Sequence, residues 1–201
     1  MSVVLNYFDF QGRGEPIRWL LSYLGVDFVD NRIPQQDWPN LKEHYEFHQV
    51  PCLEIDGMKL VQSRAIMRYV AQKHNMHPHD AYQMYLVESV IDLKEDIMKT
   101  FFKHVILDKN REAWENYIKE SMPGILRMFE ARLNDQKYFL GDSPTIADFE
   151  IAEYFYDRWL HSEDSELKLP ILRENAPKLL EYSERFVETL PEVKAYVQRR
   201  P

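Results

Sequence analysis

The sequence predicts a chain in two parts, an α/β domain over residues 1–75 followed by an all-helical domain over residues 81–201. Two observations support this division. Short β-rich runs alternate with helical patterns in the first part, whereas beyond residue 80 the apolar residues recur at helical spacing with almost no strand signal. Residues 76–80, which include Pro78, are then expected to form a linker.

The first domain opens with a predicted strand, helix and strand. The run Val3–Phe8 is apolar and β-rich, and Gly12-Arg13-Gly14 interrupts it. The helix that follows accepts Pro16 in its first turn, carries its apolar residues on one face and stops at Gly25. Val26–Ile33 supplies the second strand, so the two strands are expected to run parallel.

The rest of this domain is predicted to contain a connection, a hairpin and a helix. The polar stretch 34–49 is a long connection with at most a short helix. Residues 52–61 form two short apolar runs around Asp56-Gly57, which is typical of a two-residue hairpin turn. Ser63 is expected to cap a helix that runs to about His74. The predicted order is therefore β-α-β, connection, β-β-α.

Two patterns in the second part indicate buried helices. A stripe at helical spacing predicts a long first helix; its members are Leu86, Val90, Leu93, Ile97 and Phe101. Further on, Thr145-Ile146-Ala147-Asp148 is a capping box that opens another helix, and we assign this motif to folding.

Composition excludes several classes of function. A net charge of -8 and an isoelectric point near 5.4 argue against non-specific nucleic-acid binding. The single cysteine, Cys52, excludes an internal disulfide framework and fits a reducing compartment. No apolar run approaches the roughly 18 residues of a membrane span, and no basic segment precedes an apolar one at the N-terminus. A cytoplasmic protein is expected.

The element order and a set of motifs together resemble the cytosolic glutathione transferases, most closely their sigma class, over essentially the whole chain. No single motif is specific, but their order and spacing are. The resemblance implies a thioredoxin-like first domain, glutathione as co-substrate, a hydrophobic electrophile as second substrate and a homodimer. The matching residues are Tyr7, Gly12-Arg13-Gly14-Glu15-Pro16-Ile17-Arg18, Asp37-Trp38, Gln49-Val50-Pro51, Gln62-Ser63 and Ser143-Pro144-Thr145-Ile146-Ala147-Asp148.

The resemblance implies that Tyr7 and Arg13 activate the glutathione thiol. Such a thiol has an ordinary pKa of roughly 8.5, and a phenolic hydroxyl directed at the sulfur stabilises the thiolate and lowers that pKa. By position alone, Tyr7 would be a tyrosine packed in the core at the end of a strand. The Arg13 guanidinium would assist electrostatically, with a solvated surface arginine as the equal alternative.

The same resemblance implies backbone contacts with glutathione. A cis Val50-Pro51 bond, beside Gln49, would leave the N–H and C=O of Val50 to pair with the cysteinyl unit; an ordinary trans proline is the alternative. Gln62 and Ser63 precede a helix whose N-terminus suits the γ-glutamyl carboxylate, and simple N-capping is compatible with this.

Side chains implied at the two ends of glutathione are Trp38, Lys42 and Asp96. Trp38 and Lys42 would contact the glycyl end, unless Trp38 is only a local packing residue. Asp96 would contact the glutathione bound to the partner subunit. The alternative is a solvated acidic face with Asp92 and Glu95, a cluster that also raises a divalent-metal site on the two-fold axis. We nevertheless predict no metal.

Other candidate residues carry weaker signals. His74, His77 and His79 are discounted as metal ligands, because they span a Pro-containing linker without a further clustered ligand. Cys52 is interpreted as a small core residue. Phe47 occupies the place where several transferase classes insert an aromatic side chain into the partner, but local packing is at least as good an interpretation.

The predicted function is transfer of the glutathione thiolate to an apolar electrophile, in a cleft lined by Phe8, Met98 and Phe102. One alternative is a glutathione-dependent isomerase like prostaglandin D synthase, which Lys103 disfavours because that enzyme has a pocket aromatic there. Another is a non-catalytic, ligand-binding protein like the lens crystallins. The absence of an insertion between Phe101 and Phe129 argues for an open site instead.

Overall fold

The computed structural model describes residues 2–201, which form two compact units. The first contains the residues up to His77 together with Val187–Pro201, and the second is Pro78–Phe186. An α/β part followed by an all-helical part confirms the predicted fold class. The segment 187–201, which the sequence suggested as the end of the helical domain, belongs to the first unit. None of the helices described is long and apolar enough to cross a membrane.

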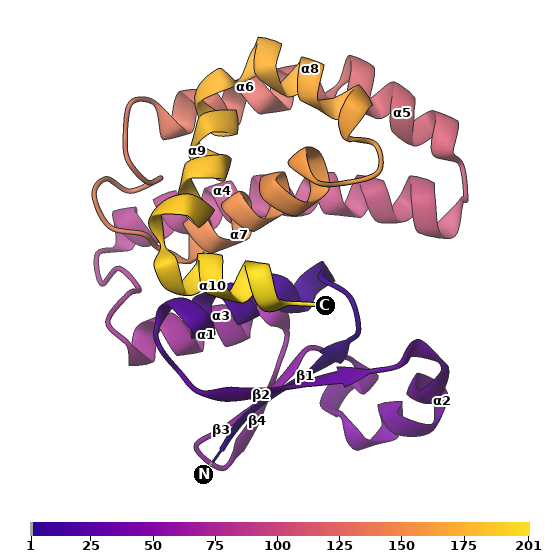
Figure 1. Cartoon of the computed structure of the whole chain (residues 1–201), viewed down its shortest axis with the longest axis vertical. Helices are drawn as coiled ribbons and strands as arrows, with labels where there is room; N and C mark the ends of the chain where they lie inside the picture. The colour runs from indigo at the N-terminus through magenta and orange to yellow at the C-terminus, as the bar shows by residue number, and fades with distance from the viewer. Residues whose placement is uncertain (1) are drawn as a thin grey trace. The chain divides into compact units, whose positions relative to one another are not determined.

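A four-stranded mixed sheet with the order β2-β1-β3-β4 forms the centre of the first unit. Strand β1 pairs in parallel with β2 and antiparallel with β3, as a βαβ unit followed by a hairpin requires. Figure 1 shows α1 and α3 on one face of this sheet, with α10 beside α1. The elements are β1 (Val3–Phe8), α1 (Glu15–Tyr23), β2 (Phe28–Ile33), β3 (Cys52–Ile55), β4 (Met58–Val61), α3 (Ser63–Lys73) and α10 (Pro191–Arg199).

The end of α1 explains why β2 begins at Phe28 and not at Val26 as predicted. Gly25 has a φ of +63° and donates its N–H to the Ser22 carbonyl, while the Val26 N–H donates to the Leu21 carbonyl. This pair of hydrogen bonds is the Schellman arrangement that closes a helix on a left-handed glycine. Val26 is therefore used to terminate the helix and is not available to the sheet.

The hairpin and the connection match their predictions in outline. Asp56 and Gly57, with φ of +54° and +78°, form the two-residue turn between β3 and β4. The connection between β2 and β3 contains only short helical turns, the four-residue α2 (Trp38–Leu41) among them. It runs from the end of β2 to the start of β3 and carries several of the candidate site residues.

Two glycines after β1 allow the chain to pass close to the ring of Tyr7. A Cβ added to Gly14 would lie 2.5 Å from Cδ1 of Tyr7, and one added to Gly12 would lie 2.6 Å from its hydroxyl oxygen. Gly12 also has a φ of +46°, which L-residues rarely adopt. Both positions of the Gly12-Arg13-Gly14 motif are thus explained by close packing on one tyrosine.

Helix α7 (Ile146–Phe155) is the core of the second unit, since all of its residues are buried. It packs against α4 (Ala81–Phe101), whose N-cap Asp80 accepts a hydrogen bond from the Gln83 N–H. The buried carboxylate of Glu150 on α7 forms an ion pair with Lys94 of α4. The remaining helices are α5 (Arg111–Glu120), α6 (Met122–Leu133), α8 (Ser165–Asn175) and α9 (Pro177–Thr189).

The predicted capping box is present at the start of α7, and its acid is buried. Asp148 accepts hydrogen bonds from the Thr145 N–H at 2.7 Å, from the Phe139 N–H at 2.9 Å and from the Tyr182 hydroxyl at 2.7 Å. Burial raises the pKa of Asp148, whereas these donors act in the opposite direction. One carboxylate thus joins the start of α7 to the preceding loop and to α9.

Substitution Asp148→Ala is expected to lower the free energy of unfolding by about 2–4 kcal/mol, because it leaves buried donors without an acceptor. Urea denaturation of the full chain measures this loss. Asp142→Ala, at an exposed position of the same loop, is the matched control and should change stability by less than about 0.5 kcal/mol. Equal stability of wild type and Asp148→Ala would contradict the assignment of this motif to folding.

Substitution Gly14→Ala is expected to destabilise the protein by about 1–3 kcal/mol, since the new methyl group overlaps the Tyr7 ring. Gly124→Ala is the matched control: it lies within α6, and its added methyl meets nothing within 4 Å. This control should be neutral or stabilising by up to about 1 kcal/mol, as alanine is the better helix former. Both changes are compared by urea denaturation, and a neutral Gly14→Ala would refute the packing argument.

Candidate active site

Strand register brings three of the predicted site residues to one edge of the sheet. Asn6 of β1 pairs with Cys52 of β3, and Cys52 pairs with Val61 of β4. The residues adjoining these three at the same end of the sheet are Tyr7 after Asn6, Pro51 before Cys52 and Gln62 after Val61. This edge also contains the carboxyl ends of the parallel strands β1 and β2, which is where open α/β sheets bind ligands.

The hydroxyl group of Tyr7 accepts a hydrogen bond from the backbone N–H of Arg13, with 2.9 Å between nitrogen and oxygen. The Tyr7 side chain is only 5% exposed, and the rings of Phe8 and Phe10 surround it at centroid distances of 5.5 Å. Because the amide occupies an acceptor position of the oxygen, the phenolic proton can be donated to another group. Tyr7 is thus packed in the core, and its hydroxyl group is able to act as a hydrogen-bond donor.

Arg13 contacts Tyr7 through its backbone. Its N–H donates to the tyrosine hydroxyl, whereas its side chain is exposed. A backbone amide is a fixed dipole that needs no side-chain ordering. The predicted guanidinium assistance stays a prediction, and the backbone contribution was missed because no sequence signal identifies it.

The peptide bond between Val50 and Pro51 is cis, as the resemblance implied. Pro51 is buried directly before β3, while Val50 is half-buried and Gln49 is exposed. No hydrogen bond found within residues 2–201 uses the N–H or C=O of Val50. Gln49 accepts a hydrogen bond at 3.1 Å from the side-chain amide of Gln62, which joins the two loops at this edge.

Gln62, and not Ser63, is the N-cap of α3. Its carbonyl accepts the first helical hydrogen bond, from the Ile66 N–H at 2.9 Å, and Ser63 is the first helical residue. Gln62 has φ +72° and ψ +106°, a rare conformation for a residue other than glycine. Strained residues of this kind concentrate at functional sites. The first N–H groups of an α-helix such as α3 have no partner within the helix, which suits an anion.

Trp38 and Lys42 lie in the connection between β2 and β3. The Trp38 ring packs edge-on against Phe8 at a centroid distance of 5.3 Å and also contacts Tyr45 at 5.6 Å. Trp38 is half-buried by these contacts, and Lys42 is exposed. Trp38 thus packs locally against two aromatic rings, and its contact with the glycyl end of glutathione stays a prediction.

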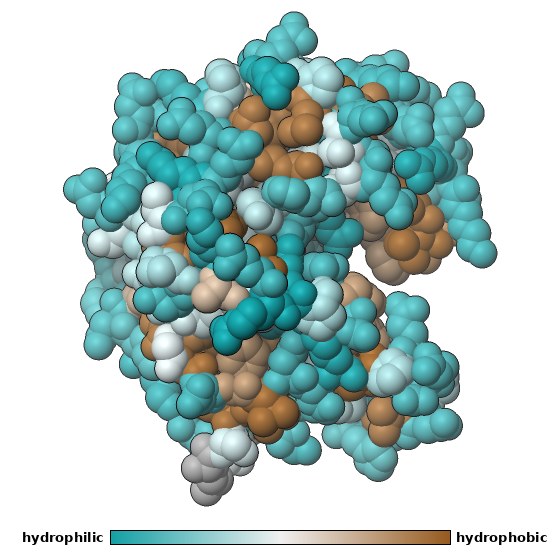
Figure 2. All heavy atoms as spheres, in the orientation of Figure 1, coloured by the Kyte–Doolittle hydropathy of each residue, from teal (hydrophilic) through white to brown (hydrophobic). Residues whose placement is uncertain are grey.

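Three of the predicted site residues, Asp96, Met98 and Phe102, belong to the second unit. Asp96 is exposed on α4, and its carboxylate forms an ion pair with Lys99 at 3.0 Å. Met98 is half-buried on the same helix, and Phe102, directly after it, is 52% exposed. Phe102 begins a six-residue π-helical turn that also exposes Ile106 and Leu107, and Figure 2 shows hydrophobic side chains gathered where α4 ends and α5 begins.

Phe10 is a candidate site residue that the sequence interpretation missed. Its ring stacks on that of Phe8, with centroids 5.7 Å apart and planes within 13°, and it is 37% exposed. The chain bends directly after β1, where the Phe10 N–H donates to the Phe8 carbonyl at 2.9 Å, and no sequence pattern identified this bend. Phe8, which was predicted to line the electrophile cleft, therefore forms an aromatic pair with Phe10.

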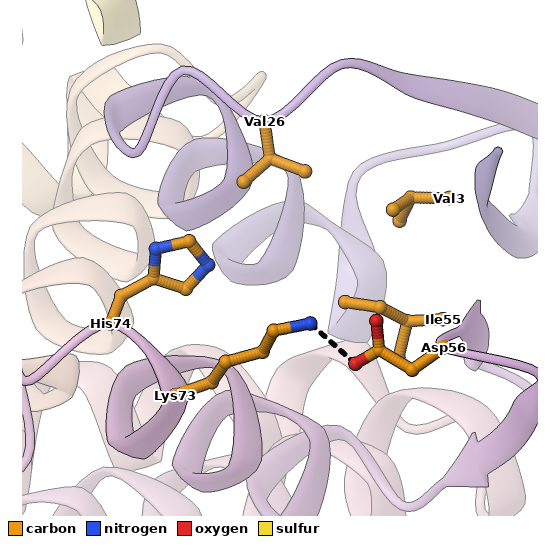
Figure 3. Close-up of a pocket in the computed structure, with 6 residues that line it drawn as sticks. All are labelled: Val3, Val26, Ile55, Asp56, Lys73 and His74. Carbon is orange, nitrogen blue, oxygen red and sulfur yellow. Dashed lines mark hydrogen bonds and ion pairs between the residues drawn. The ribbon is translucent and has the colours of Figure 1, made fainter. Parts of the chain in front are cut away.

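A separate pocket of about 380 Å³ opens at the other end of the sheet from Tyr7 (Figure 3). It is lined by Val3, Val26, Ile55, Asp56, Lys73 and His74, and the Lys73 ammonium is directed at the Asp56 carboxylate. Hydrogen bonds from Lys73 and Tyr69 lower the pKa of Asp56. This exposed ion pair joins the end of α3 to the hairpin turn, and the pocket shares no residue with the candidate active site.

Cys52, the clustering of metal-ligand residue types and Phe47 are the remaining points raised by the sequence. Cys52 is buried in β3, and burial raises the pKa of its thiol, which disfavours a reactive thiolate. Within residues 2–201 no three His, Cys, Asp or Glu side chains cluster as a metal site would require. Phe47, with φ +57°, is 59% exposed, so local packing does not bury it.

Comparison with known proteins matches both units to one family. The family model of the glutathione S-transferase N-terminal domain matches residues 3–72, and that of the C-terminal domain matches residues 91–200. The chain is 32% identical to hematopoietic prostaglandin D synthase of Gallus gallus over 98% of this chain and 96% of that protein. It is 35% identical to glutathione S-transferase A of Cavia porcellus, over 97% and 89% of the two chains.

A solved structure agrees with this assignment. The prostaglandin synthase D of Nilaparvata lugens superposes with a TM-score of 0.85 at 28% identity, covering 100% of both chains. The residues that match the N-terminal family model include β1 with Tyr7, the loop with Arg13, and the start of α3. The chain therefore belongs to the glutathione S-transferase family.

Proposed function

We propose that this enzyme joins the thiolate of glutathione to an apolar electrophile and that Tyr7 keeps the thiol ionised. Family membership supports a glutathione transferase. The observation that carries the mechanism is the 2.9 Å hydrogen bond from the Arg13 amide to the Tyr7 hydroxyl. It polarises the phenol and leaves its proton for the sulfur.

Ionisation of the thiol is the step that needs the protein. With an ordinary pKa of roughly 8.5, the thiol of free glutathione is mostly protonated at pH 7. A hydrogen bond from Tyr7 favours the charged form, and one charge-assisted bond supplies about one to two pKa units. The sulfur lone pair then forms a bond to the electrophilic carbon, and the electron pair displaced there leaves with the leaving group or takes up a proton from water.

Glutathione is held along the sheet edge in this proposal. The N–H and C=O of Val50 pair with its cysteinyl unit, in the manner of an added strand. The γ-glutamyl carboxylate binds at the start of α3, beside Gln62 and Ser63, while Gln49 supports the Gln62 side chain. Lys42 and the Trp38 indole N–H bind the glycyl end, where a cation and a donor suit a carboxylate.

The electrophile is proposed to contact Phe8, Met98 and Phe102. Phe8 is half-buried beside Tyr7, and Phe102 is among the exposed apolar residues at the end of α4. Exposed apolar patches on a folded domain are typical of binding surfaces. The expected second substrate is therefore a hydrophobic molecule with an electrophilic carbon.

We further propose a sigma-like, cytoplasmic homodimer. The exposed aromatic side chains Phe47, Tyr82 and Tyr85 support a subunit contact, since large apolar groups are enriched at interfaces. In such a dimer Asp96 accepts a hydrogen bond from the amine of the glutathione bound by the partner. The lone, buried Cys52 fits a reducing compartment.

Glutathione-dependent isomerisation is a second candidate function. The observation that favours it is the 32% identity to hematopoietic prostaglandin D synthase of Gallus gallus over 98% of this chain. Lys103, exposed after α4, is the departure that argues against a prostanoid pocket. Turnover of a prostaglandin endoperoxide, compared with that of a chloro-dinitro aromatic, separates the two activities.

Substitution Tyr7→Phe is expected to reduce turnover of a chloro-dinitro aromatic by about 100-fold or more at pH 6.5. Without the phenol, the thiol pKa returns towards its ordinary value above the assay pH. The deficit should shrink near pH 9, where the thiol ionises in both proteins. Initial rates between pH 6 and 9 measure this.

Tyr69→Phe is the matched control, because that phenol donates to Asp56 at the opposite end of the sheet. It should retain activity at every pH. Full activity of Tyr7→Phe at pH 6.5 would refute the proposed mechanism, and a Tyr7→Phe deficit that is the same at all pH values would refute the role of thiol ionisation.

Substitution Asp96→Asn is expected to raise KM for glutathione roughly tenfold, the effect of losing about 1.4 kcal/mol from a charge-assisted hydrogen bond. Asp135→Asn, which likewise neutralises an exposed acid paired with a lysine, is the control and should leave KM unchanged. Sedimentation establishes the dimer in each sample. A dimeric Asp96→Asn protein with wild-type KM would contradict the role of Asp96.

A further inference from the structure

Helix α10 contributes two side chains to a carboxylate buried at the start of α1. The Tyr196 hydroxyl donates to Oε2 of Glu15 at 3.1 Å, and Nη1 of Arg200, directly after α10, donates to Oε1 at 2.5 Å. Glu15 is fully buried, and it also accepts a hydrogen bond from the indole N–H of Trp19 at 3.1 Å. The end of the chain is thus bonded to the first residue of α1.

Glu15 connects these contacts to the buried guanidinium of Arg18. Nη1 of Arg18 lies 3.0 Å from Oε2 of Glu15, and neither side chain is exposed. Nε of Arg18 donates to Asp30 of β2 at 2.9 Å. Buried charges are tolerated only when paired and hydrogen-bonded, so a change at one member is felt by the others.

Arg18 in turn holds the loop that presents the Arg13 amide to Tyr7. Its Nη1 donates to the carbonyl of Phe10 at 3.0 Å and of Gln11 at 3.4 Å, and its Nη2 donates to that of Phe8 at 3.4 Å. These carbonyls lie between Tyr7 and the Gly12-Arg13-Gly14 turn. The position of the amide relative to the phenol therefore depends on where the guanidinium sits.

Further charges surround this cluster and keep it close to balanced. Arg32 donates to Asp30 at 2.7 Å and to the exposed Asp9 at 3.2 Å, and its Nη2 lies 3.4 Å from the Tyr196 hydroxyl. Burial, together with the negative charge of Glu15, raises the pKa of Tyr196, so this phenol remains a donor. Arg200 supplies the positive charge that faces Glu15 from α10.

We propose that Tyr196 and Arg200 are positioning residues for thiol activation: through Glu15 and Arg18 they fix the amide that bonds to Tyr7. Docking of α10 then sets how far the thiol of bound glutathione ionises. The inference rests on the proposed function of Tyr7. Tyr196 and Arg200 thus act on the sulfur through other residues, without contacting it.

The test measures the pKa of the glutathione thiol in the binary complex, from the ultraviolet absorbance of the thiolate, in Arg200→Met and Tyr196→Phe. Loss of either donor is expected to raise that pKa by about 0.5–1 unit. At pH 6.5, kcat/KM should fall by about 3- to 10-fold, with KM for glutathione changed less than about twofold. Arg200→Lys, which keeps a cation beside Glu15, should restore most of the shift.

Arg199→Met is the matched control, because Arg199 is exposed and its Nε donates to the carbonyl of Ala195 in the same helix. It should leave the thiol pKa unchanged. Tyr196→Phe preserves volume, so it keeps the test valid if Arg200→Met fails to fold. An unchanged thiol pKa in folded Tyr196→Phe and Arg200→Met would overturn the inference. A wild-type complex whose thiol is still protonated at pH 7 would instead overturn the proposed function.

Discussion

The guanidinium of Arg18 lies fully buried under the loop that follows β1, where it donates to two carboxylates and three backbone carbonyls. A charge at this depth is stable only with such a complete set of acceptors. The acceptors come from the end of β1, from the loop after it, from α1 and from β2, so one side chain is bonded to every part of the βαβ unit. The site at the end of β1 depends on this arrangement.

Much of the candidate site consists of backbone and not of reactive side chains. The Arg13 amide bonds to Tyr7, the cis Val50-Pro51 bond shapes the entrance to β3, and Gln62 starts α3 in a rare conformation. Fixed dipoles of this kind need no reorganisation when a ligand binds. The Arg13 amide can approach the Tyr7 hydroxyl because Gly12 and Gly14 have no side chains. A Cβ at either position would overlap with Tyr7 and displace the loop.

The second unit is built on a different principle, a helix that is buried on every side. Such a helix must satisfy its polar residues internally. Asp148 does so through the capping box and Tyr182, and Glu150 through Lys94. The rigid core that results supports α4, whose end exposes the apolar residues proposed to contact the electrophile. Stability and substrate contact are thereby assigned to different parts of the unit.

The order of the elements, the hairpin turn at Asp56-Gly57 and the capping box at Thr145–Asp148 were predictable from the amino-acid sequence, because each depends on a local pattern of residue types. It also predicted the position of Tyr7 at the end of β1 and, through the family resemblance, the cis bond before Pro51.

Contacts between residues far apart in the chain could not be predicted in this way. No spacing rule relates Glu15 to Tyr196 and Arg200, which are brought together by packing of α10 on α1. The N-cap at Gln62 and the start of β2 at Phe28 also differed from prediction. The first depends on the hydrogen bond from the Ile66 N–H to the Gln62 carbonyl, and the second on the bond from the Val26 N–H to the Leu21 carbonyl. Residue type fixes what a group can bond to, but the fold fixes which group is near enough.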